Sequence, residues 1–337
     1  MRFVALLAAV AALSTPASSA DIGGIIGGLG KNLEKMREAV PAVTTLRQTQ
    51  TASAMPEAAY ENLLAAPLWQ APASQPEAVD LHAGFLTPKS QGNRNVCSVF
   101  ATTGLAEYLV ASKYGDRREL SKEALFNQAK FDFTGKPELQ AYKSESGLAG
   151  YVAVLALQGG VIAETDWPFM PSYKNPSPKP PVTDPEVSPK PEGIAGKILP
   201  YKFSPTVIRR DQIKYFLAKE RRPVVMNMML YISGMDKKTG RLNEPTDEQR
   251  AACAEKGADC GGHVILLTGY DPKTGDYTFR NSWGAQWGEG GYGRMSEKYL
   301  MENCEACSYL GRLAKMDAAS RTMVVNATHG WSATVGR

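Results

Sequence analysis

The pattern of hydrophobic and polar positions divides this chain of 337 residues into two halves of different character. In the first half, apolar and small residues without proline occupy 99–111 and 147–157, which is typical of buried helices. A third helix is predicted over 121–131, where Ser121 can cap the first turn. The proline-rich segment 171–191 then lacks the backbone donors that helices and sheets need, so it predicts a surface connection between the halves.

In the second half, the apolar runs become short and strand-like. Strands are predicted over 223–230, 263–270, 277–281 and 290–295. The second and third of these runs are joined by a turn sequence over 271–276, so they form an antiparallel hairpin. The sequence therefore predicts a helical first half and a mainly antiparallel second half.

The two ends of the chain differ from this globular part. Residues 1–20 combine a basic start, an apolar run of eleven residues and small residues before Ala20, which is typical of a cleaved secretory signal peptide. A run of that length is too short to span a bilayer, which takes about 20 residues. Sparse large apolar residues over 21–78 predict either a flexible leader or a pro-segment that covers a cleft. The folded part is predicted over 79–316, followed by a C-terminal tail at 317–337.

Composition adds little beyond a globular class, but the cysteines are informative. The chain is 43% hydrophobic and 21% charged with a net charge of +4, which gives no indication of nucleic-acid binding. Export would place its five cysteines in an oxidising compartment, where an odd number leaves one thiol unpaired. Cys253 and Cys260 can close a small loop, and a local disulfide is the favoured interpretation of Cys304 and Cys307. Pairing between these two sets stays open, and Cys97 is the residue left over.

Cys97 also has the surroundings of a nucleophile. It stands where the first helix is predicted to begin, so the positive end of the helix dipole would favour its thiolate. Gln91, six residues earlier, can offer an amide N–H to a developing oxyanion. His263 begins one strand of the predicted hairpin and Asn281 ends the other, so the Asn281 amide oxygen can accept an imidazole N–H. Trp283 can shield that hydrogen bond from water.

These residues lie in segments that resemble the papain family of cysteine peptidases. The segment 91–101 resembles the nucleophile segment of the family, and 262–270 resembles its histidine strand. The segment 281–293 matches the asparagine segment nearly residue for residue. The stretch 146–168 resembles the part that carries the substrate-backbone site, and 223–225 resembles the first strand of the second lobe.

The resemblance implies an α+β, papain-like fold with two lobes and an active-site cleft between them. A helical left lobe is expected over about 79–195 and an antiparallel β-barrel-like right lobe over about 196–316. The distances from Cys97 to the histidine and asparagine are 166 and 184 residues, longer than the expected 130 to about 150. Insertions at the proline-rich segment and at 233–260 account for the excess.

The resemblance also implies an activity, the hydrolysis of peptide bonds through an acyl-enzyme on Cys97. His263 would act as base and acid, Asn281 would orient it, and Gln91 with the Cys97 backbone N–H would form the oxyanion hole. The substrate-binding residues carried over by position are Ser146, Gly147 and Trp283.

The implied partner is a peptide or protein substrate, and a proteinaceous inhibitor is a further partner that such a cleft can accept. We expect a secreted or periplasmic monomer without a cofactor, a metal, nucleic acid or a membrane as partner. Two alternatives stay open on sequence alone: a peptide-binding module that kept the fold without catalysis, and a relative that transfers the acyl group to an amine instead of water.

The chain departs from the family beside the nucleophile. Arg94 stands where the family has a cysteine three residues before the nucleophile, and the partner of that cysteine, which would fall near Ser144, is missing too. Ser98 replaces the aromatic residue that normally follows the nucleophile. The sequence therefore predicts an altered frame around Cys97.

Overall fold

The three helices expected in the first half are present in the structure, which is a computed structural model. Helix α4 (Cys97–Tyr114) extends the predicted helix at both ends and stops at Gly115, whose φ of 71° is a left-handed C-cap. Helix α5 (Lys122–Asn127) starts after Ser121, whose side chain accepts the Ala124 N–H at 2.9 Å as the sequence predicts. Helix α6 (Gly150–Ala156) is described from Gly150 onward. The structure describes residues 77–129, 150–171, 190–208, 210–257 and 259–317.

The strands expected in the second half are also confirmed, and they join one sheet of eight strands. The predicted runs correspond to β3 (Val224–Tyr231), β5 (Cys260–Asp271), β6 (Asp276–Arg280) and β7 (Tyr292–Ser296). Strand β5 begins three residues before His263, so the prediction that this histidine opens the strand is wrong. The order across the sheet is β2-β8-β3-β5-β6-β7-β4, and β1 (Val79–Asp80) pairs with β5.

Two long strands and several short elements have no counterpart in the sequence prediction. Strand β2 pairs with β8 from Tyr201↔Lys315 to Ile208↔Ser308, and β8 pairs on its other side with β3. All these pairings are antiparallel, whereas β4 runs parallel to β7. The elements not predicted are β2 (Tyr201–Ile208), β4 (Arg241–Leu242), β8 (Cys304–Lys315), α7 (Ile213–Ala218), α8 (Asp247–Lys256) and α9 (Glu297–Asn303), with 3₁₀ turns η2 (His82–Gly84), η5 (Leu157–Gly159), η6 (Ile194–Lys197) and η7 (Arg210–Gln212).

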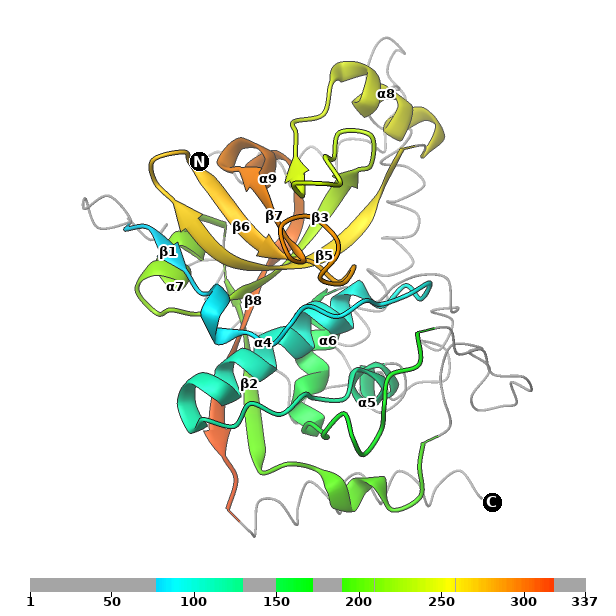
Figure 1. Cartoon of the computed structure of the whole chain (residues 1–337), viewed down its shortest axis with the longest axis vertical. Coiled ribbons are helices and arrows are strands. Elements are labelled where there is room, and N and C mark those ends of the chain that lie inside the picture. The colour runs from blue at the N-terminus through cyan, green and yellow to red at the C-terminus, as the bar shows by residue number, and fades with distance from the viewer. Residues whose placement is uncertain (1–76, 130–149, 172–189, 209, 258, 318–337) are drawn as a thin grey trace, which may run out of the picture. The chain divides into compact units, whose positions relative to one another are not determined.

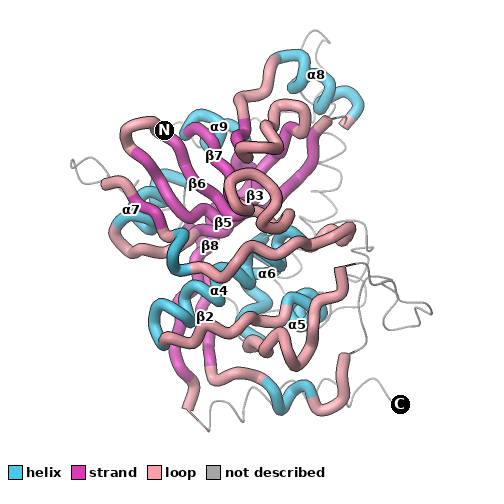
Figure 2. The backbone as a smooth tube through the Cα atoms, viewed as in Figure 1, coloured by secondary structure: helices cyan, strands magenta, loops and turns pink. Residues whose placement is uncertain are grey.

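The helices of the first half lie apart from most of the strands, as the α+β prediction requires. Figure 1 shows α4, α5 and α6 grouped together beside the strands β3, β5, β6 and β7. Figure 2 shows β3, β5, β6 and β7 gathered on one side of α4, whereas β2 and β8 run on past α4 alongside the helices. Helix α4 packs against β5, and 13 of its 18 residues are buried, so α4 joins the helical part to the sheet. The nucleophile candidate and the histidine candidate lie on these two elements.

The helical part has an apolar core of its own. Trp167, which is 3% exposed, packs there with apolar side chains from α5 and η6 and with Met316, which follows β8. The end of the described chain therefore closes the helical part after completing the sheet. The full cluster is Ala124, Ile162, Trp167, Ile194, Ile198 and Met316.

Residues Pro245–Asp259 belong to a compact unit separate from the rest of the described chain. Within this unit, Thr246 caps α8 with a complete capping box: its side chain accepts the Gln249 N–H, and the Gln249 side chain accepts the Thr246 N–H at 2.8 Å. Because the capping box satisfies backbone N–H groups of the first turn, it explains why this insertion forms a helix.

The state of the cysteines corrects one prediction and supports another. Cys253 and Cys260 are both disulfide-bonded, in line with the expected loop closure. Cys97 is a free thiol. Cys304 is not part of a disulfide, so the favoured Cys304–Cys307 disulfide is wrong. Cys304 is the first residue of β8 and is 3% exposed, which places its thiol in the interior. In the part of the chain that the structure describes, no helix is long and apolar enough to cross a membrane.

Candidate active site

Cys97 is the first residue of α4, a long and largely buried helix. Its N-cap residue, Val96, has no side chain that can accept the free N–H groups of the first turn. The unneutralised positive end of the helix dipole therefore acts on the Cys97 sulfur. The Cys97 side chain remains partly exposed, so a substrate can reach it.

His263 lies on β5 and meets Asn281 just beyond the end of β6. His263 is 7% exposed, and its Nε2 lies 2.8 Å from Asn281 Oδ1. Because an amide oxygen only accepts, Nε2 carries the proton in this contact. The other ring nitrogen, Nδ1, is therefore the one available to the Cys97 thiol, with which His263 also makes a hydrogen bond. The structure thus brings together all three residues that the sequence predicted as a catalytic set.

Trp283 covers the imidazole. Its ring stacks on His263 with a centroid separation of 4.9 Å and an interplanar angle of 28°. Trp287 holds Trp283 from the side in an edge-on contact at 5.2 Å. An aromatic face over the ring limits the access of water to the His263–Asn281 hydrogen bond, which strengthens that bond.

The charges of the cysteine and histidine reinforce each other. Burial alone would raise the pKa of the Cys97 thiol, but the adjacent His263 charge and hydrogen bond outweigh it, and the pKa is lowered. Burial alone would lower the pKa of His263, but the Cys97 charge and the hydrogen bonds to Cys97 and Asn281 raise it. Both shifts favour a thiolate–imidazolium pair at neutral pH.

Gln91 is held at both ends of its side-chain amide. Its Nε2 donates to the Arg94 carbonyl oxygen at 2.6 Å, and its Oε1 accepts the Ser282 hydroxyl at 2.5 Å. The backbone joins the same contact, because Gln91 N–H donates to the Ser282 carbonyl at 2.8 Å. The loop that carries Gln91 is thus tied to the residue next to Asn281, and the second Nε2 hydrogen remains for another acceptor.

Two features of this site were not predicted from the sequence. Ser282 was part of the recognised 281–293 segment, yet its role in holding Gln91 depends on a contact between residues 191 positions apart. The second is the ion pair between Arg94 and Glu123, which lies behind the nucleophile loop. In the sequence Arg94 stands out only as a departure from the family pattern, and a lone buried arginine gives no sequence signal of its partner.

The predicted substrate-binding roles stay predictions. Ser146 and Gly147, expected to bind substrate, lie outside the described residues, as does Ser144. Trp283 contacts the histidine, and its substrate-binding role stays a prediction. Ser98, the residue after Cys97, is fully buried. The change beside the nucleophile that the sequence predicted therefore places a small polar side chain in the interior.

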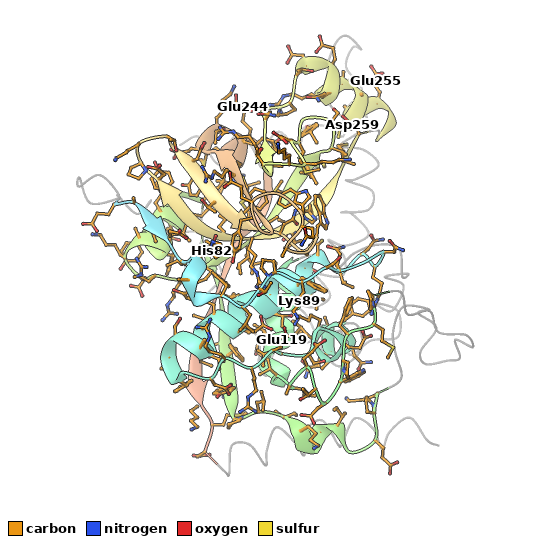
Figure 3. All side chains as sticks on the ribbon, viewed as in Figure 1. His82, Lys89, Glu119, Glu244, Glu255 and Asp259 are labelled. Atoms are coloured by element: carbon orange, nitrogen blue, oxygen red, sulfur yellow. The ribbon has the colours of Figure 1, made fainter. Side chains whose placement is uncertain are left out.

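A second group of charged residues lies on α4, at the start of α5 and on the loops before Gln91 and before α5. Lys89 and Glu119, labelled in Figure 3, form an ion pair of 2.8 Å between the loop before Gln91 and the loop before α5. Closer to α4, the buried Lys122 ammonium lies 3.3 Å from the Glu107 carboxylate. In the described residues, no cluster of histidine, cysteine and acidic side chains suits a metal ion.

Comparison with known proteins agrees with this geometry. A model of the family described as papain family cysteine protease matches residues 75–310. The chain belongs to this family. The sequence-based prediction of the family is therefore confirmed, and so is the prediction of its α+β fold.

Individual relatives are distant from this papain-family chain. Cysteine proteinase 3 of Solanum lycopersicum is 25% identical over 237 residues, which are 67% of this chain and 57% of that protein. Pro-cathepsin H of Medicago truncatula is 26% identical over 231 residues, 65% of this chain and 56% of its own. The chain thus spans little more than half the length of these curated relatives.

Solved structures support the fold. Xylellain, a cysteine protease from Xylella fastidiosa, superposes with a TM-score of 0.56 at 21% identity, covering 71% of this chain and 87% of xylellain. The cysteine protease and lectin-like domains of Cwp84 from Clostridium difficile give a TM-score of 0.52 at 17% identity, covering 72% and 54%.

Proposed function

We propose that the protein is an exported cysteine peptidase that hydrolyses peptide bonds through a Cys97 thiolate. The observation that carries the proposal is the arrangement of the free Cys97 thiol, the His263 ring and the Asn281 oxygen, with pKa shifts that favour the ion pair. A structural cysteine buried in a core has no need of such a partner.

The chemistry follows from the positions of these groups. The Cys97 thiolate attacks the scissile carbonyl carbon, and the carbonyl oxygen becomes an oxyanion. The second Nε2 hydrogen of Gln91 and the Cys97 backbone N–H stabilise that charge. The His263 imidazolium then gives its proton to the leaving amine, which leaves an acyl-thioester on Cys97.

The second half of the cycle uses the same residues in reverse. The neutral His263 takes a proton from water, and the resulting nucleophile attacks the thioester. Cys97 departs as a thiolate, His263 is again an imidazolium, and the acid product is released. Asn281 keeps the imidazole in one orientation through both halves, since its oxygen accepts the Nε2 hydrogen throughout.

The activity is tested by replacing the nucleophile. Cys97→Ala is expected to reduce the hydrolysis of a fluorogenic peptide mixture to the background rate, because no other group in the site can form the thioester. Cys304→Ala is the matched control: it removes a second cysteine that is outside any disulfide and buried on β8, and activity should remain. Hydrolysis that survives in Cys97→Ala would contradict the proposal.

The same assay identifies the acyl acceptor. With an amine nucleophile added at increasing concentration, the proposed peptidase releases mainly the free acid. A product that is mainly the amide, even at low amine concentration, would show acyl transfer instead.

Export rests on the signal-like pattern of residues 1–20, and it leads to a secreted or periplasmic location. When the full-length chain is expressed in a bacterial host, we expect to recover the mature protein outside the cytoplasm, with an N-terminus near Asp21. Intact-mass analysis and N-terminal sequencing measure this. A cytoplasmic product that retains Met1 and Arg2 would contradict export and leave the peptidase proposal standing.

A further inference from the structure

The Arg94 guanidinium is buried where the family would have one half of a disulfide. Its side chain is 2% exposed, and the carboxylate of Glu123, its partner on α5, is 0% exposed. Two parallel hydrogen bonds join the groups, at 2.7 Å from Nη1 to Oε2 and 3.3 Å from Nη2 to Oε1. A paired, bidentate geometry of this kind fixes the orientation of both planes as well as their separation.

The same guanidinium holds a third segment of the chain. Its Nη1 also donates to the Met170 carbonyl at 3.0 Å. The rings of Phe126 and Phe169 lie over the charge, with centroids 5.1 and 4.9 Å from Cζ. Arg94 therefore fastens the loop before the nucleophile to α5 and to the segment that ends near Met170.

The backbone of Arg94 in turn holds the oxyanion-hole candidate. Its carbonyl oxygen accepts the Gln91 amide at 2.6 Å, inside the tight turn that also includes the Arg94 N–H contact to the Gln91 carbonyl at 3.4 Å. With Ser282 holding the other end of the amide, the position of the Arg94 carbonyl decides where the second Gln91 hydrogen points.

We propose that the buried Arg94–Glu123 ion pair is a positioning device for the oxyanion hole: it fixes the Arg94 carbonyl, and through it the Gln91 amide. This inference rests on the proposed peptidase function. Neither Arg94 nor Glu123 touches the reacting atoms in this account. Because the link is ionic, a thiol reductant does not open it, as it would a disulfide in the same place.

The test compares two reactions of Cys97 that need different parts of the site. Peptide hydrolysis passes through an oxyanion, whereas alkylation by iodoacetamide displaces iodide at a saturated carbon and forms none. Gln91→Ala is expected to lower kcat for hydrolysis by about 10² to 10³-fold. Arg94→Met should lower kcat by about tenfold or more through misplacement of the same amide. Neither variant should change KM or the alkylation rate more than a few-fold, since the thiolate–imidazolium pair is intact.

A double-variant cycle shows whether Arg94 acts through Gln91. If it does, Arg94→Met adds little to the loss of kcat already present in Gln91→Ala. Equal losses of kcat from Arg94→Met in the wild-type and Gln91→Ala backgrounds would overturn the proposal. So would a fall in the alkylation rate as large as the fall in kcat, because a general loss of structure moves both.

Arg94→Met leaves the Glu123 charge buried without its partner, so this variant can fail to fold. The Arg94→Met, Glu123→Met double variant removes both charges and keeps an apolar interior, which such sites tolerate well. It should fold, alkylate normally and still show the low kcat. Arg94→Lys should recover only part of kcat, because an ammonium cannot make the bidentate contact.

Arg118→Met is the matched control, since the Arg118 side chain is 52% exposed in its ion pair with Asp116 and its replacement should leave kcat unchanged. Wild-type kcat in the folded double variant would overturn the positioning role and leave the peptidase proposal intact. If the wild-type protein shows neither peptide hydrolysis nor alkylation of Cys97, both the positioning role and the peptidase proposal are contradicted.

Discussion

Three consecutive residues after β6 each hold a different part of the active site. Asn281 accepts the His263 N–H and also the Ser282 backbone N–H at 2.8 Å, so its oxygen is fixed from two sides. Ser282 donates its hydroxyl to Gln91, and Trp283 stacks on the His263 ring. The strong sequence match over this segment therefore reflects three separate contacts, of which only the first and last were foreseen.

Substitutions at two of these residues should have separable effects. Asn281→Ala frees the imidazole to rotate, and misplacement of this kind can cost about 10²-fold in kcat/KM. It should also slow the alkylation of Cys97, because the thiolate loses a well-placed imidazolium. Ser282→Ala should lower peptide hydrolysis with little effect on alkylation, since it acts on Gln91. Stopped-flow alkylation beside steady-state hydrolysis measures both, and an Asn281→Ala variant with wild-type rates would contradict the role given to Asn281.

At the scale of elements, Gly293 on β7 is required by the packing of that strand against the turn at Gly240. A Cβ atom on Gly293 would lie 2.3 Å from the Gly240 carbonyl oxygen and 2.6 Å from Phe279 Cζ. Real Cβ atoms do not approach a backbone oxygen so closely, so β7 needs glycine at this position for the turn at Gly240 to pack against it. The segment 281–293 therefore contains residues that support the fold as well as residues of the active site.

Gly293→Ala tests this reading of the segment. We expect it to lower the free energy of unfolding by about 1–3 kcal/mol, because the added methyl overpacks a site closed by backbone. Gly196→Ala is the control: a Cβ there meets no atom within 4 Å, and the change should stay within about 0.5 kcal/mol. Urea unfolding of both variants gives the comparison. Equal stability of the two variants would contradict the account.

The strands that the sequence analysis did not predict were missed for identifiable reasons. Strand β2 contains Pro205, and a proline inside an apolar run argues against a central strand. The structure places β2 at the edge of the sheet, where a missing N–H costs no ladder bond on the open side. Strand β8 follows α9 directly and pairs with β2 over a long sequence separation, which no local pattern reveals.

At the scale of the whole molecule, the family match and the order of cysteine, histidine and asparagine along the chain predicted the fold and the identity of the site. The details that set its geometry were less accessible. Arg94 and Glu123 are 29 residues apart, and nothing in either local sequence marks them as a buried pair. Counting cysteines predicted that Cys97 is unpaired, but it wrongly placed Cys304 in a disulfide, since grouping cysteines into close pairs ignores whether their side chains can meet.

The central claim, that Cys97 is held as a thiolate by His263, is tested most directly by the pH dependence of Cys97 alkylation. The lowered pKa of Cys97 keeps the thiolate present to lower pH, and the raised pKa of His263 keeps its imidazolium partner present to higher pH. The rate with iodoacetamide, with the adduct located by peptide mass mapping, should therefore stay high far below the value of about 8.5 at which an ordinary cysteine titrates. In His263→Ala the profile should shift back toward that value. A wild-type profile that already follows an ordinary cysteine, or an adduct at Cys304 with none at Cys97, would contradict the account.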